Sequence, residues 1–298
     1  MTPHVTLVLG AGGPVGKAFH AGVLHALVEG CGWDPRAADV IVGTSAGAHV
    51  GALLRAGWDT YRLAHVLTPP AVPPPPPPGR RWPASGPYLR SVLARPWLTR
   101  LGPLVAALLP EGVHEGAHFA ALHPLFAHWP HLPLWIPAVH ADSGARVVFG
   151  RDDVPLIDVA TAVRCSTAVP GVRQPVAVGA MRYIDGGITS PTHADLAVHA
   201  EVAAERRRTV IVLSPLSRFL PLRLLLRWEI RPLVKRGYDV MLFEPDRDVS
   251  AAMGWNPMDP HRGGEVAEAA YHATRKRLER TGVAAAVCML MGTNGGGI

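Results

Sequence analysis

A serine flanked by glycines is the residue of this sequence that most directly suggests chemistry. Ser45 stands in VGTSAGA, a G-x-S-x-G motif whose glycines are Gly43 and Gly47. In this motif the serine lies on a tight turn between a strand and a helix, and the glycines permit close approach and unusual backbone angles. The N–H groups of the following helix point at the same place and favour negative charge there. We therefore interpret Ser45 as a candidate nucleophile rather than as an ordinary turn residue.

A nucleophilic serine needs a base, and Asp185 is the strongest candidate. It ends a predicted strand in RYIDGG, and the turn at Gly186 and Gly187 would bring its carboxylate to the sheet edge that carries Ser45. A carboxylate within hydrogen-bond reach of a hydroxyl can act directly as its base. An α/β-hydrolase would instead present serine, aspartate and histidine in that order, with the serine after several strands. The alternative for Asp-Gly is a plain hairpin turn.

Three of the fifteen histidines lie near these motifs. His49 follows Ser45 by one helical turn, and His20 lies on the first predicted helix. We expect both to pack or to contact water. His193 follows Asp185 by eight residues and could form a triad, although a place outside the dyad is the favoured interpretation.

A glycine loop follows the first predicted strand, in VTLVLGAGGPVG. Gly10, Gly13 and Gly16 fit a GxxGxxG variant of the dinucleotide-binding fingerprint. That fold needs an acidic or basic residue at the tip of the second strand, to meet the adenosine ribose. Here the nearest acids, Asp34 and Asp39, precede the second strand. The NAD(P)-binding hypothesis therefore lacks its anchor.

An oxyanion hole explains this loop better, because it would lie beside the serine turn. Its N–H groups would then point at the oxygen of a tetrahedral intermediate. Gly12 and Gly13 are the expected donors, whereas Pro14 has no N–H to give.

The elements that would position these groups alternate between strand and helix. The pattern predicts strands at 5–9 and 39–42 and helices at 16–28 and 46–56, a βαβα unit with parallel strands. We therefore expect an α/β fold in which a mostly parallel central sheet is flanked by helices. Further strands are predicted at 132–141, 145–150 and 209–216, and further helices at 158–168 and 263–282.

A proline-rich stretch interrupts this alternation. Residues 73–78 are all proline, which excludes helix and central strand. We interpret about 68–132 as a helical cap insertion in a single domain of residues 1–290, with a flexible tail at 291–298. Its tryptophans would line an acyl-chain site or pack on one another: Trp82, Trp97, Trp129 and Trp135.

Composition limits the setting of the protein. The chain has 298 residues, 48% of them hydrophobic, which is enough for a full core. Its three cysteines are far apart, which excludes a disulfide scaffold and a zinc site and suits the cytoplasm. We find no signal peptide and no apolar run of about 20 residues that could span a membrane.

The net charge of +6 could favour an anionic surface, although arginine-rich codon usage explains it equally well. Residues 223, 227, 231 and 235 form a basic stripe at four-residue spacing. The stripe could contact an anionic membrane, or it could be the solvated face of a helix packed on the sheet. We expect a lipid or acyl-ester substrate, peripheral membrane contact at most, and no nucleic acid partner.

Three motifs in order, GAGGPVG, GTSAG and DGG, resemble those of the patatin-like phospholipase family. The segment AVRCSTAVPGVRQPVAVGAMRYIDGGITSPTHADLA is also similar, and the likeness covers most of residues 5–280 outside the insertion. The resemblance implies a serine lipid acyl hydrolase with a Ser–Asp dyad and without metal or cofactor. It would make Ser45 the nucleophile, Asp185 the base, and Gly12 and Gly13 the oxyanion donors. The turns would be shaped by Gly10, Gly16, Gly43, Gly47, Gly186 and Gly187.

Two positions depart from the family pattern. Val15 stands where many members have arginine or lysine, and Ala11 stands where glycine is common. Lys17 follows the last loop glycine instead of preceding it, so it is not a clean substitute for the basic residue. These two departures affect how the loop is held in place and whether the protein binds a phosphate headgroup. A lipid-binding protein without catalysis therefore remains an alternative.

Overall fold

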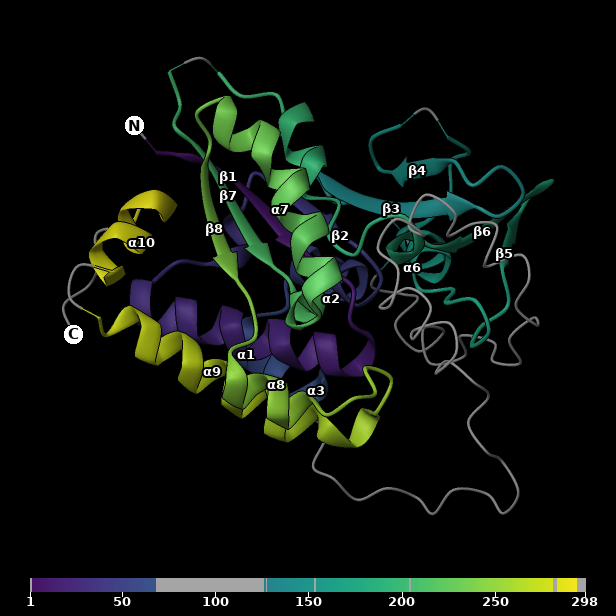
Figure 1. Ribbon diagram of the computed structural model, residues 1–298. Helices are drawn as coiled ribbons and strands as arrows, with labels where there is room; N and C mark the ends of the chain where they lie inside the picture. The colour runs from purple at the N-terminus through teal and green to yellow at the C-terminus, as the bar shows by residue number, and fades with distance from the viewer. Residues whose placement is uncertain are drawn as a thin grey trace.

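A computed structural model describes residues 2–67, 126, 128–152, 154–203, 205–280 and 283–293 (Figure 1). The proline run, Trp82, Trp97 and most of the predicted cap lie outside these residues, as does the end of the predicted tail. Trp129 and Trp135 are described. Trp129 donates from its indole nitrogen to the carbonyl of Ile157 at 2.7 Å, and Trp135 is a buried strand residue.

An eight-stranded mixed sheet forms the centre of the molecule, in the order β5-β6-β3-β2-β1-β7-β8, with β4 also paired to β3. Strands β3, β2, β1, β7 and β8 run parallel, whereas β4 and β6 pair antiparallel with β3, and β5 with β6. The strands are β1 (His4–Leu9), β2 (Val40–Gly43), β3 (Leu134–His140), β4 (Arg146–Phe149), β5 (Val176–Val178), β6 (Met181–Asp185), β7 (Arg208–Leu213) and β8 (Asp239–Phe243).

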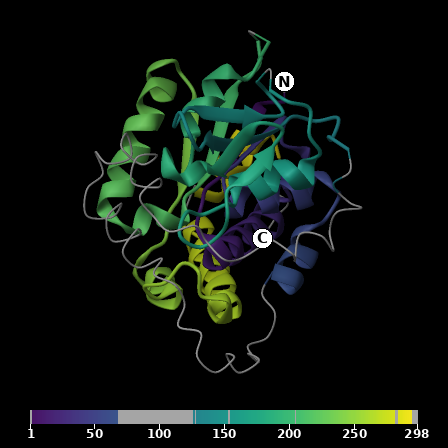
Figure 2. The same ribbon diagram turned by 90° about the vertical axis from the view of Figure 1, so that its right-hand side faces the viewer.

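Helices cover both faces of this sheet, so the predicted α/β fold is confirmed. Helix α7 lies on one face, and α1, α8 and α9 lie on the other (Figures 1 and 2). The helices are α1 (Gly13–Cys31), α2 (Ala46–Arg55), α3 (Thr60–Leu67), α6 (Val159–Ser166), α7 (Leu220–Lys235), α8 (Arg247–Met253), α9 (Gly263–Leu278) and α10 (Val283–Met291). Among the helices of the described residues, none is both long enough and apolar enough to cross a membrane.

The two largest hydrophobic cores follow from the alternation of side chains along β1. Leu7 and Leu9 point into the core shared with α1 and α9, and Val8 points into the core shared with α7. All three side chains are fully buried. Because both faces are covered, a strand such as β1 is buried along its whole length and is mostly apolar.

Helix α1 begins three residues earlier than the sequence predicted. The prediction began the helix at Gly16, but the helix starts at Gly13 and takes Pro14 into its first turn. Proline is compatible with that turn, because the first N–H groups of a helix have no partner within it. Helix α10, which ends at Met291 within the predicted tail, was not expected from the sequence.

The register of the strands brings two distant turns together. Val42 of β2 is level with Trp135 of β3. Beyond the end of β2, the Ser45 amide is linked through Ser166 to the carbonyl of Pro137, which directly precedes Ala138, the partner of Asp185 in β6. β6 is antiparallel to β3, so it approaches the carboxyl edge of the parallel strands from the opposite direction. Ser45 and Asp185 therefore meet at one edge of the sheet.

The close crossing of α1 and α9 gives a stability prediction. A Cβ at Gly22 would lie 2.2 Å from the carbonyl oxygen of Ala267, so Gly22→Ala must push the two helices apart. We expect a loss of about 1–3 kcal/mol in the free energy of unfolding, measured by thermal or urea denaturation. Gly264→Ala in α9 is the control, because a Cβ there has nothing within 4 Å and alanine favours helix. Equal melting temperatures for the two variants would contradict the close crossing.

Candidate active site

Ser45 occupies a strained turn between β2 and α2. Its backbone has φ 54° and ψ −110°, a positive-φ conformation that residues other than glycine rarely adopt. The Ser45 amide donates to the hydroxyl of Ser166 at 3.0 Å, and that hydroxyl donates to the carbonyl of Pro137 at 2.6 Å. Neighbouring elements thus hold the turn in its strained form.

The glycines of this turn are required by close packing. A Cβ at Gly47 would lie 1.9 Å from the carbonyl oxygen of Leu9, and one at Gly43 would lie 2.5 Å from the carbonyl oxygen of Gly47. The Leu9 carbonyl also accepts from the Thr44 amide at 3.0 Å. The start of α2 therefore rests directly on the end of β1.

Asp185 is the last residue of β6 and is 3% exposed. Its Oδ1 accepts from the amide of Gly187 at 2.7 Å, whereas its Oδ2 has no hydrogen-bond partner within the described residues. A Cβ at Gly186 would lie 2.5 Å from the carbonyl oxygen of Pro137, so this turn also needs glycine. The Gly187 amide therefore holds Oδ1 in place, and Oδ2 is available for a hydrogen bond to another group.

The environment of Asp185 makes it more basic than an exposed aspartate. Burial raises its pKa to about 6, while the Ser45 hydroxyl, the Gly187 amide and the positive charge of Arg173 oppose the rise. The Ser45 hydroxyl opposes the rise in this pKa, although Oδ2 has no hydrogen bond of acceptable length and angle within the described residues. Such contacts often shorten only when substrate binds.

The glycine loop leaves two amides without an acceptor among the described residues, those of Gly12 and Gly13. Gly13 has φ 60°, and a Cβ on it would lie 2.6 Å from the carbonyl oxygen of Pro257. The other loop amides are paired: Gly10 with Leu213 O at 3.0 Å, Ala11 with Pro191 O at 2.7 Å, Val15 with Pro257 O at 3.3 Å and Gly16 with Gly12 O at 2.8 Å. The two unpaired amides are those that the sequence analysis selected.

A cleft that is open to solvent joins these groups. Gly12, Gly13, Ser45, Asp185 and Gly187 line it together. The rest of the lining is mostly apolar and includes Val169, Ile188, Leu216, Leu222 and Met258. The arrangement places a hydroxyl, a carboxylate and two amides at one end of an apolar cleft.

The three histidines have different surroundings. His20 is fully buried, its Nε2 contacts the carbonyl of Gly10 at 2.7 Å, and burial lowers its pKa to about 4. A neutral His20 therefore donates to the start of the glycine loop. His49 is buried on α2. The ring nitrogens of His193 contact Thr44 and Thr189 rather than the dyad residues.

Two residues near the site were not assigned a role from the sequence. Ser166 supports the Ser45 turn, and Arg173 acts electrostatically on both Asp185 and Lys17. Burial and the charge of Arg173 lower the pKa of Lys17 to about 8. Ser166 and Arg173 both lie in the segment AVRCSTAVPGVRQP, but a lone serine or arginine in such a segment carries no motif that would mark it.

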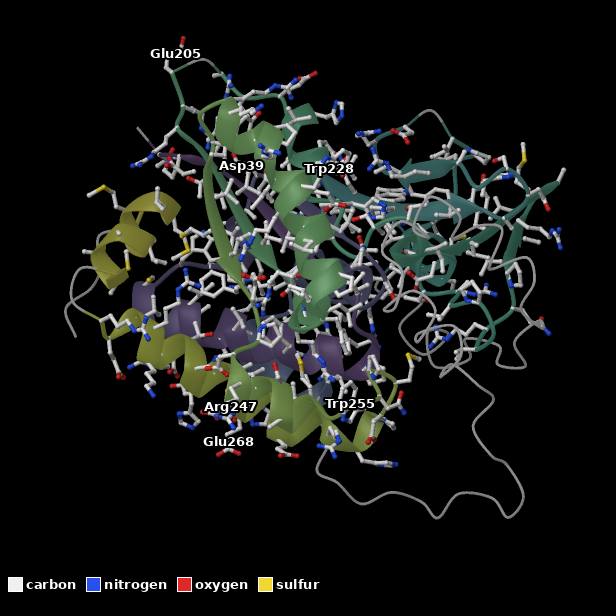
Figure 3. The ribbon with its side chains drawn as sticks, viewed as in Figure 1. Asp39, Glu205, Trp228, Arg247, Trp255 and Glu268 are labelled. Carbon is white, nitrogen blue, oxygen red and sulfur yellow. The ribbon has the colours of Figure 1, made fainter. Side chains whose placement is uncertain are left out.

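The acids that a dinucleotide site would need lie elsewhere. Asp39 pairs with Arg206 at 2.8 Å and accepts from the Val5 amide at 2.8 Å, at the amino end of the parallel strands (Figure 3). Asp34 pairs with Arg36 at 2.8 Å. Within the described ranges, no group of three or more His, Cys, Asp or Glu side chains could hold a metal ion.

Known proteins match this chain in two kinds of comparison, of structure and of sequence. Among solved structures, VipD from Legionella pneumophila matches with 12% identity and a TM-score of 0.45, over 92% of this chain and 66% of that one. The type III effector protein ExoU matches with 16% identity and a TM-score of 0.40, over 94% of this chain and 53% of that one. The chain thus spans just under two thirds of the first and about half of the second. The sequence profile of the patatin-like phospholipases matches residues 7–198, and so the chain belongs to the patatin-like phospholipase family.

Proposed function

We propose that this protein is a serine lipid acyl hydrolase that cleaves fatty-acyl esters through Ser45 and Asp185. Family membership supports lipid acyl hydrolysis in general. One observation carries the specific proposal: the Ser45 hydroxyl, the Asp185 carboxylate and the unpaired amides of Gly12 and Gly13 line the same cleft.

In the first half of the reaction, Asp185 takes the proton of the Ser45 hydroxyl as its oxygen attacks the ester carbonyl carbon. The carbonyl oxygen becomes an oxyanion and accepts from the amides of Gly12 and Gly13. The tetrahedral intermediate collapses, the bond to the alcohol oxygen breaks, and that oxygen receives the proton from Asp185. An acyl-Ser45 ester and a free alcohol result.

In the second half, Asp185 takes a proton from a water molecule that attacks the acyl-Ser45 carbonyl. The same two amides hold the second oxyanion. When the intermediate collapses, the serine oxygen leaves and recovers the proton, and the fatty acid is released. The carboxylate returns to its ionised form, so both halves use the same groups.

The cleft walls support an acyl chain as the part of the substrate that is bound. Leu216, Leu222 and Met258 offer apolar surface beside the reacting groups. Burial of apolar surface contributes about 25 cal/mol per Å² and does not depend on the headgroup. The proposal therefore covers phospholipase and general esterase activity alike.

We also propose that the outer face of α7 contacts an anionic membrane. The helix packs on the sheet through Leu226, Ile230 and Leu233, as the simpler interpretation of the basic stripe expected. Two members of the stripe are partly neutralised, because Arg223 and Arg227 pair with Glu244 at 3.4 and 2.5 Å. Arg231 and Lys235 are exposed.

Apolar side chains on the same outer face support this contact. Leu220, Leu224 and Trp228 follow one another at four-residue spacing and are 64%, 58% and 64% exposed. Trp255, 85% exposed, lies in the loop after α8, next to cleft residues Asn256 to Met258 (Figure 3). Exposed tryptophan and leucine beside cations are the combination that anionic lipid surfaces bind.

The cytoplasmic location of the protein stays a prediction.

Removal of either dyad residue should abolish catalysis. We expect Ser45→Ala and Asp185→Asn to lower the hydrolysis of a p-nitrophenyl acyl ester by at least about 10³-fold, since each removes a reacting group. A fluorophosphonate probe should label the wild type and fail to label Ser45→Ala. Ser143→Ala and Asp248→Asn, at exposed positions, serve as controls and should keep full activity. Unchanged labelling of Ser45→Ala would refute the nucleophile and favour a lipid-binding protein without catalysis.

The raised pKa of Asp185 predicts the pH dependence. The base acts as the ionised carboxylate, and burial raises its pKa to about 6. We therefore expect kcat/KM to rise as the pH increases through about 6, and to fall about tenfold per pH unit below that point. The measurement is hydrolysis between pH 4.5 and 8, corrected for spontaneous hydrolysis, with circular dichroism to confirm that the protein stays folded. A profile that is flat across pH 5–7 would contradict the assigned base.

Membrane contact through α7 is tested by co-sedimentation with liposomes. We expect binding to vesicles that contain about 30% anionic lipid at low salt, and weaker binding for the double variant Leu224→Ser/Trp228→Ser. Met289→Ser on α10 is the matched control, because Met289 is 65% exposed but lies on another helix. Equal binding of the double variant and the control would contradict contact through this face.

A further inference from the structure

We propose that His193 is a positioning residue that ties the Ser45 turn to the Asp185 turn through a chain of hydrogen bonds. This inference rests on the proposed function. His193 is fully buried, and both its ring nitrogens are engaged. Nδ1 lies 3.1 Å from the hydroxyl of Thr44, and Nε2 lies 3.2 Å from the hydroxyl of Thr189.

The direction of this chain follows from the single proton of a hydroxyl. The Thr189 hydroxyl donates to the carbonyl of Gly186 at 3.1 Å, so it accepts from His193. Nε2 therefore carries the hydrogen of the neutral ring, and Nδ1 accepts from the Thr44 hydroxyl. Burial lowers the pKa of His193 well below its usual value, which keeps the ring in this neutral form.

The ends of the chain adjoin the two reacting residues. Thr44 directly precedes Ser45, and Gly186 directly follows Asp185. The chain thus connects two turns that are far apart in sequence and that belong to strands which are not neighbours in the sheet. Proton transfer needs the serine oxygen and the carboxylate oxygen about 2.6–3.2 Å apart. A link between the two turns restricts that separation.

His193 is itself held from both sides. Its backbone is left-handed, with φ 51° and ψ 36°, and its amide donates to the Ser190 hydroxyl at 2.8 Å. Glu229, buried on α7, accepts through Oε2 from the Thr192 hydroxyl at 2.6 Å and from the Ala194 amide at 3.2 Å. The residues on either side of His193 are therefore anchored to one carboxylate, and the ring has little freedom to move.

The test removes one hydroxyl of the chain without removing the histidine. Thr189→Val keeps the shape of the side chain but cannot bond to Nε2, whereas Thr189→Ser keeps the hydroxyl. We expect Thr189→Val to lower kcat for a p-nitrophenyl acyl ester by about 10–100-fold, with KM changed less than about twofold, because misplaced reacting groups slow chemistry more than binding. Thr189→Ser should stay within about threefold of the wild type.

A double-mutant cycle shows whether the chain acts as one unit. Thr44→Val and Thr189→Val break the same chain at opposite ends, so the double variant should lose little more kcat than the worse single variant. Losses that multiply, or a Thr189→Val enzyme with wild-type kcat, would overturn the proposal. An equally large fall in kcat for Thr189→Ser would also overturn the proposal. All variants are compared at a temperature where circular dichroism shows each one to be folded.

A second measurement separates this proposal from the proposed function. NMR of protein labelled with ¹⁵N-histidine should show the His193 ring neutral with its hydrogen on Nε2, and the His193 signals should shift in Thr189→Val. If the wild type neither hydrolyses esters nor reacts with the fluorophosphonate, the proposed function fails. The hydrogen-bond chain is then judged by the NMR signals alone. A His193 that is protonated, or that carries its hydrogen on Nδ1, would overturn the chain whatever the activity.

Discussion

The packing of the Ser45 turn onto the end of β1 is the constraint on which the rest of the site depends. Glycine at position 47 allows α2 to start on the Leu9 carbonyl, and the same carbonyl holds the Thr44 amide. Both sides of Ser45 are thus fixed to β1, and the serine is held at a positive φ. Since β1 continues directly into the glycine loop, the loop amides and the serine hydroxyl share one anchor.

Burial then sets the chemistry of the groups that this packing brings together. Asp185 has lost nearly all contact with water, which makes its carboxylate a stronger base, while Arg173 and the Gly187 amide keep it from becoming neutral at pH 7. Burial also keeps His20 and His193 neutral, so each ring can accept a hydrogen bond at one nitrogen and donate one at the other. In our account, the neutral histidines hold the turns in place through hydrogen bonds, and the carboxylate moves the proton.

The sequence predicts the parts of this arrangement that are encoded locally. The βαβα unit and the α/β class follow from short patterns, and G-x-S-x-G identifies a turn whose glycines the packing requires. The roles of Ser45 and Asp185 stay predictions. The antiparallel approach of β6 and the support from Ser166 depend on pairings between distant segments, which no local pattern specifies. The ion pairs of Glu244, which follows β8, with two arginines of the basic stripe are likewise contacts between distant segments.

The central claim is that Ser45 forms a covalent acyl-enzyme in the cleft that it shares with Asp185. The most direct measurement is mass spectrometry of the protein after rapid acid quench during turnover of a slowly hydrolysed acyl ester. Our account predicts the mass of one acyl group on the proteolytic peptide that contains Ser45, and its disappearance as substrate is exhausted. Turnover without acylation of that peptide, or acylation of another residue in its place, would contradict the account.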